Sequence, residues 1–573
     1  MYAATHGEAV GMTPYLINFA KLADMKKYLN KIVVILLIAL GLIFNSSTNS
    51  DFEISKNLDI FATLYRELNQ NYVDEIQPGE LMKIAIDEML KSLDPYTVFF
   101  PESDIEDVKF LTTGQYGGIG SLIQQQDNKI IITEPYEGFP AQLNGLMAGD
   151  QILEINGKSV SGKTVSEVSD LLKGQPGSTI ELLIKRPFEE KPINKSIQRK
   201  EITVGDIPYY GMVDSKIGYI KLNGFTMNAG NLVKRALEDL KANNTAMEGI
   251  ILDLRGNGGG LLNEAVNIAN IFVDRGITVV QTKGKLSNSN KSYKTLNSAV
   301  DKNIRLAVLI DGQSASASEI VAGFIQDVDR GVIIGQKSFG KGLVQNVIPL
   351  SYNTSLKVTT AKYYIPSGRC IQAIDYSKKI NGKAVQYKDS TKHKFTTKNG
   401  RIVYDAGGIL PDIVIEPDSL SEITVSLIIK NHIFNFVTQY VHEHSSISTP
   451  DKFKFTENDY QQFLAYLEGR EYDYKTASEI KLEELIEAMK EDKYYESSIS
   501  EINNLKSKVG HNKQRDLELF KDEIMNIIGY EIVSRYYYQK GRIIYNLQTD
   551  KEVKKAIDVL LNNNEYNKII SGK

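Results

Sequence analysis

Three alternating serines and one lysine are the residues of this 573-residue chain best suited to covalent chemistry. The serines occupy residues 314–318 (SASAS), a run of small residues between an apolar segment and a helical pattern. Lys341 follows in a turn bounded by glycines. No histidine occurs between His6 and His393, so a Ser–His–Asp triad would need a distant imidazole. The pattern therefore favours a serine activated by a lysine, as in a Ser–Lys hydrolase.

A small-residue turn from a strand into a helix can lift one hydroxyl into the open, as in a nucleophile elbow. The residues alone do not choose among Ser314, Ser316 and Ser318, and a plain helix N-cap is the competing interpretation. Lys341 can act as a base only if burial favours its neutral form, because a free lysine has a pKa near ~10.4. Gln345, four residues later, is able to hold the lysine or a serine hydroxyl in place.

A second loop that could take part in catalysis or binding is the glycine-rich segment 253–260 (DLRGNGGG). It follows an apolar strand pattern and opens a helix. Backbone N–H groups in such a loop can bind an oxyanion or a phosphate. Neither the dinucleotide fingerprint nor the Walker spacing fits, because no lysine-serine or lysine-threonine pair follows the glycines. An oxyanion site is the favoured interpretation.

Both loops lie in a region where apolar strands and amphipathic helices alternate. Strands are predicted at residues 219–222, 249–254, 306–310 and 332–334, and helices at residues 231–242, 263–272 and 317–324. Continuous apolar strands separated by helices predict an α/β sheet covered on both faces.

Short apolar runs and glycine turns between residues 116 and 186 indicate a small β-rich domain. The string LMAGDQILEING (146–157) reads as a turn, a strand and a hairpin turn, and resembles a PDZ domain. Upstream, the loop YGGIG (116–120) precedes a strand and faces a predicted helix at residues 165–172. Its backbone N–H groups, at Gly118, Ile119 and Gly120, are expected to capture the terminal carboxylate of a peptide.

The N-terminus has the pattern of an export signal. Thirteen apolar or glycine residues at 32–44 follow a basic segment and precede a polar one, and Met25 is a better start for such a signal than Met1. Since about 20 residues are needed to span a bilayer, a cleaved signal or a short anchor is expected.

Composition excludes several other classes of protein. A net charge of −4 argues against a general nucleic-acid binder, and a single cysteine, Cys370, excludes an intramolecular disulfide. Residues 421–573 are helical in pattern, charged and tyrosine-rich, without a chemistry-bearing cluster. His442 and His444 are too close together for a helical metal pair.

Taken in order, these segments resemble the C-terminal processing peptidases (tail-specific proteases, peptidase family S41). The resemblance implies that Ser316 is the nucleophile, Lys341 its general base and Gln345 the third member of the triad. It also implies an oxyanion hole formed by the backbone N–H groups of Gly260 and Ala317, with no metal or organic cofactor. The matching strings are YVD (72–74), SLDPY (92–96), DLRGNGGGL (253–261), SASASE (314–319), GQKSFGKGLVQ (335–345), YIPSGR (364–369) and GGILPD (407–412).

The implied fold is multidomain α/β, with a crotonase/ClpP-like protease core, a small PDZ domain, an N-terminal helical segment and an all-helical C-terminal extension. The expected boundaries are 1–50 for the signal or anchor, 51–110 for the helical region, 111–200 for the PDZ domain, 201–420 for the core and 421–573 for the extension.

The resemblance implies an exported serine endopeptidase, periplasmic or anchored facing that side, which cleaves proteins near free C-termini. Its partners would be protein or peptide substrates, and only the N-terminal segment would meet the membrane. Helical extensions commonly mediate dimerisation or partner docking, so a homodimer or adaptor contact is expected of residues 421–573. Two alternatives are a non-catalytic PDZ adaptor and an acyl-CoA-handling crotonase-like enzyme.

Overall fold

The computed structural model describes residues 51–104, 109–110, 112–380, 382–387, 390 and 392–572. The predicted export segment lies outside these residues. Within them, no helix combines the length and apolar character needed to cross a membrane. The chain divides into two compact units between Met89 and Leu90.

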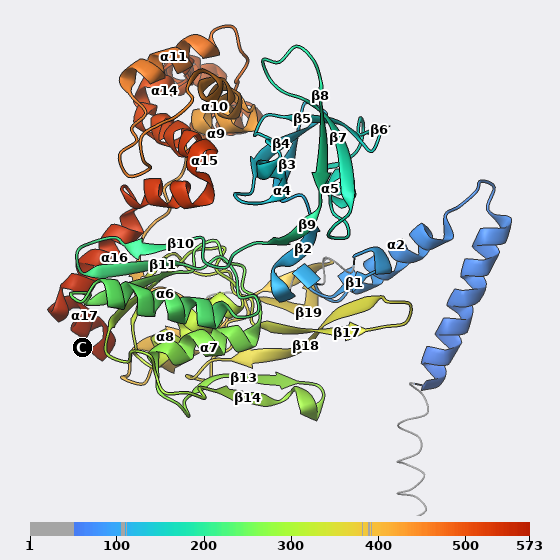
Figure 1. The fold of residues 1–573 in the computed structure, drawn as a ribbon, viewed down its shortest axis with the longest axis vertical. Helices are drawn as coiled ribbons and strands as arrows, with labels where there is room; N and C mark the ends of the chain where they lie inside the picture. The colour runs from blue at the N-terminus through green and yellow to red at the C-terminus, as the bar shows by residue number, and fades with distance from the viewer. Residues whose placement is uncertain are drawn as a thin grey trace, which may run out of the picture. The chain divides into compact units, whose positions relative to one another are not determined.

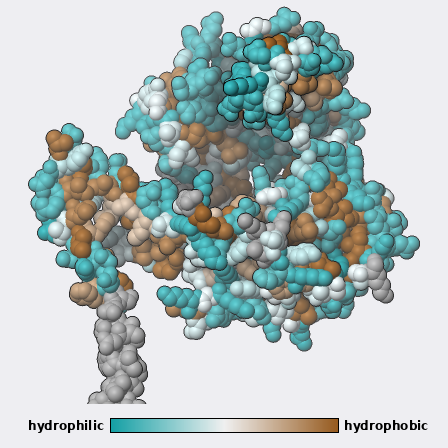
Figure 2. Space-filling view, turned by 180° about the vertical axis from the view of Figure 1, so that it is seen from behind, coloured by the Kyte–Doolittle hydropathy of each residue, from teal (hydrophilic) through white to brown (hydrophobic). Residues whose placement is uncertain are grey.

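The first unit is a pair of helices, as predicted. Residues 51–71 are helical, and α2 (Pro78–Lys91) begins after the turn that contains the QPG string. The Tyr65 hydroxyl donates to the carbonyl oxygen of Pro78 at 2.5 Å and joins the two helices. Apolar side chains remain exposed along this unit (Figure 2), among them those of Phe52, Leu58, Phe61, Leu64 and Leu68.

The α/β core of the second unit is built on a six-stranded sheet in the order β10-β11-β12-β15-β16-β23. All pairs except the antiparallel β10–β11 are parallel, as the continuous apolar strands predicted. Alternate strand residues face opposite sides, so each face needs its own cover. The strands are β10 (Tyr209–Met212), β11 (Ile217–Lys221), β12 (Gly249–Asp253), β15 (Arg305–Ile310), β16 (Val332–Gly335) and β23 (Ile413–Val414).

Helices cover both faces of this sheet (Figure 1). The connecting helices α6 (Ala229–Asn243), α7 (Leu262–Phe272) and α8 (Ala317–Asp327) pack on one face. The other face is covered by α16 (Lys551–Leu561) and α17 (Asn563–Ser571), at the end of the chain. The prediction of a sheet covered on both faces is therefore confirmed, although the sequence did not indicate where the second cover comes from.

A second sheet carries the segment around Lys341. Its order is β1-β18-β13-β14, and β17 also pairs with β18. The β17–β18 hairpin was not predicted, since its residues are only partly buried and lack a clear apolar pattern. The strands are β1 (Val98–Phe100), β13 (Thr278–Gly284), β14 (Lys291–Lys294), β17 (Leu343–Pro349) and β18 (Ser355–Tyr364). Two further hairpins are β19 (Ile374–Ile380) with β20 (Lys383–Gln386) and β21 (Lys394–Thr396) with β22 (Ile402–Tyr404).

The predicted PDZ domain is a separate antiparallel sheet with its own apolar core. Helix α5 (Val165–Leu172) has the predicted bounds and begins with a capping box between Thr164 and Glu167. A short ladder of β2 (Gln115–Gly118) with β9 (Lys200–Thr203) connects the domain to the core. The strands are β3 (Ser121–Gln126), β4 (Lys129–Pro135), β5 (Gln151–Ile155), β6 (Lys158–Ser159), β7 (Thr179–Lys185) and β8 (Ile193–Gln198), with α4 (Pro140–Leu143) beside them.

The C-terminal extension is helical, as predicted, and packs around an aromatic core that includes Phe436 and Phe463. It contacts the PDZ domain through an ion pair from Arg542 to Glu134 at 2.8 Å. The helices before α16 are α9 (Glu422–Ile429), α10 (His432–Glu443), α11 (Glu457–Leu467), α12 (Ala477–Glu491), α13 (Ile499–Val509), α14 (Lys513–Leu519) and α15 (Lys521–Leu547).

The packing of α16 on the core generates a stability prediction. Leu560→Ala should lower the free energy of unfolding of the core by about 2–5 kcal/mol, because it leaves a cavity against a fully buried sheet. Its neighbour Leu561 is 40% exposed, so Leu561→Ala should cost far less. Urea unfolding of both variants gives the comparison. Equal losses would show that α16 does not cover the sheet.

Candidate active site

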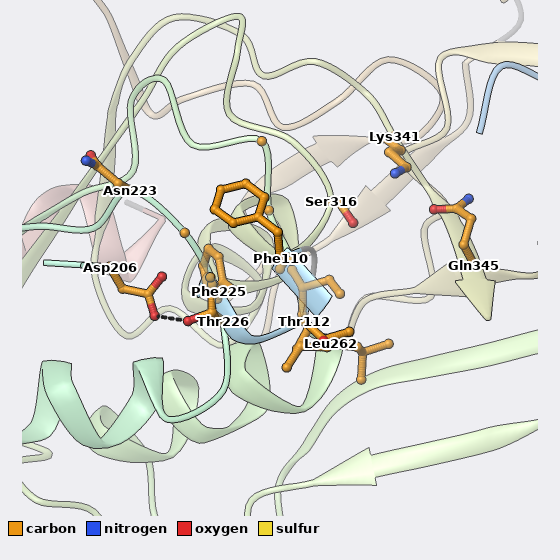
Figure 3. Close-up of a pocket in the computed structure, with 18 of the residues that line it drawn as sticks. Phe110, Thr112, Asp206, Asn223, Phe225, Thr226, Leu262, Ser316, Lys341 and Gln345 are labelled. Atoms are coloured by element: carbon orange, nitrogen blue, oxygen red, sulfur yellow. Dashed lines mark hydrogen bonds between the residues drawn. The ribbon is translucent and has the colours of Figure 1, made fainter. Parts of the chain in front are cut away.

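Ser316 lies at the turn between β15 and α8 in a backbone conformation that few residues adopt. Its φ of 55° and ψ of −110° fall outside the usual allowed regions. Strain of this kind persists only where the surroundings impose it, and it is typical of a nucleophile elbow. The side chain lines a cavity of about 460 Å³ (Figure 3).

The flanking serines are fully buried and hold two loops together. The Ser314 hydroxyl donates to the carbonyl oxygen of Leu254 at 2.8 Å, and the Ser318 hydroxyl donates to that of Asn257 at 2.9 Å. Both are thus engaged in fixing the glycine loop against the elbow. Of the three serines that the sequence left open, Ser316 is the one that reaches the cavity.

Lys341 lines the same cavity immediately before β17. Burial, and then the nearby charge of Lys357, lower the pKa of Lys341 to about 8. A substantial fraction of the amine is then neutral just above neutral pH, as the role of a base requires. The residues lining this cavity include no histidine.

Ser316 and Lys341 face each other across the cavity (Figure 3). Among the residues that the structure describes, no hydrogen bond joins the Ser316 hydroxyl to the Lys341 amine. Catalytic hydrogen bonds are often long in the free enzyme and shorten when substrate binds. The structure therefore brings the two predicted site residues to one cavity without a hydrogen bond between their side chains.

Gln345 is on β17 beside Lys341, and its side chain lines the same cavity (Figure 3). Its amide nitrogen donates to the Thr359 hydroxyl on β18 at 3.2 Å. A register shift between Val344 and Gln345 re-aims the strand at this point. The amide is therefore oriented by the neighbouring strand, and its oxygen is available to the lysine.

A buried glutamate joins the backbone of Ser316 to that of Lys341. One carboxylate oxygen of Glu319 accepts the backbone N–H groups of Ser316 at 2.8 Å and Lys341 at 2.9 Å. The other accepts the Gly340 N–H at 2.7 Å and the Ser338 hydroxyl at 2.6 Å. Burial raises the pKa of Glu319 to about 7, against the opposing effect of these four hydrogen bonds.

The glycine loop lies directly against the elbow. A Cβ on Gly259 would meet the backbone nitrogen of Ala317 at 2.9 Å and the Cβ of Ser316 at 2.9 Å, and the φ of Gly259 is +100°. Any side chain there would obstruct the N–H of Ala317. Asn257 shapes the loop by accepting the Gly259 N–H at 2.9 Å and donating to the carbonyl oxygen of Leu222 at 2.9 Å.

The backbone N–H groups predicted to form the oxyanion hole are available beside Ser316. Those of Gly260 and Ala317 donate no hydrogen bond to any other described residue, and both residues line the cavity. They are the two donors expected for the oxyanion hole. Gly260 itself packs against Phe225, whose carbonyl oxygen would be 2.5 Å from an added Cβ.

The start of the same loop has a structural role. Asp253 is buried and accepts from the Tyr219 hydroxyl at 2.7 Å and from the Arg255 guanidinium at 2.7 Å. Burial acts to raise the pKa of Asp253, but the charges of Arg255 and Lys221 outweigh it and hold the pKa below its usual range. Arg255 also pairs with Asp550 at the start of α16, at 2.7 Å, and so links the loop to the C-terminal cover.

The PDZ loop expected to bind a carboxylate lies between β2 and β3. The carbonyl oxygens of Ile119 and Gly120 accept the N–H groups of Ala141 and Tyr136, at 2.7 and 2.9 Å. The Ile119 side chain is buried in the domain core, and Gly120 has a φ of +74°. The backbone of residues 118–120 is therefore held in place.

Family comparisons agree with this arrangement. The family described as peptidase family S41 matches residues 216–382, and a PDZ domain family matches residues 131–186. A carboxy-terminal-processing protease of Bartonella bacilliformis is 37% identical over 330 residues, which make up 57% of this chain and 75% of that protease. This chain belongs to peptidase family S41.

Other relatives extend this result. A "Probable CtpA-like serine protease" of Staphylococcus aureus (strain COL) is 35% identical over 319 residues, or 55% of this chain and 62% of that protein. The family of the "Probable PDZ-protease, C-terminal helical domain" matches residues 423–560, in the extension for which the sequence had suggested no family.

The photosystem II D1 C-terminal processing protease has a TM-score of 0.35 and 26% identity, and the alignment covers 63% of this chain and 93% of that structure. The PDZ domain of a carboxy-terminal protease from Vibrio cholerae, in complex with peptide, has a TM-score of 0.15 and 31% identity, over 16% of this chain and 99% of that structure.

Sequence reasoning missed two side chains of this S41 site: Glu319 and Lys357. For Glu319 a signal existed, since a glutamate three residues after a helix-capping serine is the spacing of a capping box. Lys357 is on the unpredicted strand β18, so nothing along the chain placed it near Lys341.

Glu319 provides the prediction that tests this geometry. Glu319→Gln should reduce cleavage at least about tenfold, because its amide nitrogen would face N–H donors and leave some of them unpaired in the interior. Steady-state kinetics and a melting curve measure the effect. Glu238→Gln, on the exposed face of α6, is the matched control and should change neither the cleavage rate nor the melting temperature. Full activity of Glu319→Gln would mean that the carboxylate does not position the elbow.

Proposed function

We propose that this S41 protease is an exported serine endopeptidase that uses a Ser–Lys mechanism and recognises the C-termini of its substrates with its PDZ domain. The observation that carries the proposal is one cavity that holds a strained, accessible Ser316, a Lys341 with lowered pKa and two available N–H donors. The basic and apolar pattern of residues 25–44 supports export.

In the proposed mechanism the Ser316 hydroxyl attacks the scissile carbonyl carbon, and its proton passes to the neutral amine of Lys341. The N–H groups of Gly260 and Ala317 stabilise the negative charge that develops on the carbonyl oxygen. The Lys341 ammonium then protonates the leaving amine. Water hydrolyses the acyl-enzyme by the same steps, and Gln345 keeps the lysine directed at the serine.

The adaptor alternative, a chain that binds C-termini without cleaving them, has less support. A strained backbone costs free energy, and so does a buried carboxylate. This chain has a strained backbone at Ser316 and the buried Glu319 carboxylate beside it. A protein that only binds C-termini through a PDZ domain needs neither feature. The crotonase-like alternative does not account for a PDZ domain ahead of the core.

A homodimer or adaptor contact through the helical extension is part of the same proposal. The apolar face of α16 is already buried against the core. Such a contact would therefore use the exposed apolar side chains of α12 and α13, namely Ile480, Leu485 and Leu505.

The mechanism predicts a specific pH dependence. Ser316→Ala and Lys341→Ala should both be inactive, and Lys341→Arg should not restore cleavage, because a guanidinium stays protonated. In the wild type, kcat/KM should level off above the lowered pKa of Lys341, about 8, and fall about tenfold per pH unit from there to pH 7, since only the neutral amine accepts a proton. Below the pKa of Glu319, about 7, the fall should be steeper, because protonation removes an acceptor that holds the elbow. Ser314→Ala, which keeps Ser316, separates nucleophile loss from loop damage. Activity in Lys341→Arg would exclude the Ser–Lys mechanism.

The PDZ proposal predicts a dependence on the substrate C-terminus. A peptide with an amidated C-terminus should bind about ten- to a hundredfold more weakly than the free acid, because charge-assisted hydrogen bonds contribute about 1.5–3 kcal/mol. Fluorescence anisotropy with Ser316→Ala protein measures binding without cleavage. Gly120→Val should weaken binding of the free acid, since a side chain on this loop residue would collide with Phe139 beside α4. Equal affinity for both peptides would contradict carboxylate capture.

A further inference from the structure

The ring of Tyr96 covers the amine of Lys341. The Lys341 nitrogen lies 4.3 Å from the centroid of the ring, within the range of a cation–π contact. The edge of Tyr376 supports Tyr96 at a centroid distance of 6.0 Å and an interplanar angle of 89°. Tyr96 comes from the SLDPY segment, which the mechanism leaves without a role.

The backbone of that segment is fixed tightly enough to aim the ring. Asp94 is buried and accepts the N–H groups of Tyr96 at 2.8 Å and Thr97 at 2.9 Å. The Thr97 hydroxyl accepts the N–H of Thr359 at 3.3 Å, and β1 then pairs with β18 so that Val98 is opposite Lys357. The turn is thus attached to the strand that also orients Gln345.

The ring has two opposing effects on the lysine. It excludes water, which disfavours the charged form, while the negative face of its π system favours the ammonium. The charged groups that act on Lys341 are Lys357 from β18, which lowers its pKa, and Glu319 from α8 and Asp94, which raise it.

No ion pair joins Lys341 to a carboxylate among the described residues, and the oxygens of Glu319 are occupied by four other donors. A carboxylate partner would raise the pKa of a lysine and keep it protonated, because it stabilises only the charged form. An aromatic face stabilises the ammonium more weakly. It can therefore support the ammonium after proton transfer without preventing the amine from accepting a proton.

We propose that Tyr96 is a positioning residue for Lys341: its ring holds the amine toward Ser316 and stabilises the ammonium that forms during cleavage. The proposal rests on the proposed function, in which Lys341 is the general base. The ring, and not the hydroxyl, is the active feature, so phenylalanine should replace tyrosine and leucine should not.

Direct titration of Lys341 tests the ring without relying on activity. The protein is labelled with lysine carrying ¹³C at Cε, in the Ser316→Ala background, and the Lys341 resonance is assigned by its loss in Lys341→Arg. Tyr96→Phe should leave the pKa unchanged. Tyr96→Leu keeps an apolar cover but removes the π face, so the pKa should fall by about half to one and a half units. Tyr96→Ala admits water, and the pKa should rise.

Kinetics in the active protein provide the second measurement. Tyr96→Leu should lower kcat about tenfold or more, leave KM nearly unchanged and move the pH profile to lower pH, whereas Tyr96→Phe should behave as wild type. Tyr495→Leu removes a ring that faces Lys490 in the helical extension and should change neither kcat nor the profile. Melting temperatures of the leucine and phenylalanine variants confirm that the fold is retained.

The possible failures are distinguishable. If Tyr96→Leu shifts neither the Lys341 pKa nor kcat, the positioning role is wrong, even where Lys341 proves to be the base. If Tyr96→Phe is as impaired as Tyr96→Leu, the hydroxyl acts instead of the ring, and the proposal is also wrong. If Lys341→Ala retains cleavage, the proposed function itself is wrong, while the titration still reports on the contact.

Discussion

The active site depends on the carboxylate of Glu319 more than on any contact between the catalytic side chains. A buried carboxylate is costly unless donors satisfy it, and here four donors do so from two separate segments. Two of these donors are the backbone N–H groups of Ser316 and Lys341. One satisfied charge therefore holds the backbones of Ser316 and Lys341 at a fixed separation, although no hydrogen bond joins their side chains among the described residues.

Several sequence motifs of the core are hydrogen-bonded to this carboxylate or to the serine loop. The Ser338 hydroxyl that donates to Glu319 accepts the N–H of Ile409 at 2.6 Å, so the GGILPD string is tied to the same carboxylate. Asn257 accepts the N–H of Ala315 at 3.0 Å, so the glycine loop is fixed to the serine loop from the other side. With both sides held, the strained φ of Ser316 can persist without relaxing.

The sequence predicted most of the single helices and strands, but few of the contacts between segments that are distant in the chain. The central strands and α5, α7 and α8 were recovered because apolar period and length determine them. The choice among Ser314, Ser316 and Ser318 was not recoverable from the residues, because it depends on which hydroxyls find carbonyl partners in another loop. The β17–β18 hairpin was missed because its partly buried residues lack a clear apolar pattern. The cover formed by α16 was missed because the strands that it packs against lie far away in the chain.

The lysine shows how several weak influences can produce a usable base. Burial and Lys357 push the pKa of Lys341 down, whereas Glu319 and Asp94 push it up. Glu319 is fully occupied by its own hydrogen bonds, and Asp94 by the turn that carries Tyr96, so neither carboxylate forms an ion pair with the amine. A single direct ion pair would have fixed the protonated state. By satisfying its carboxylates elsewhere, the fold keeps the pKa of Lys341 lowered, as the proposed role of general base requires.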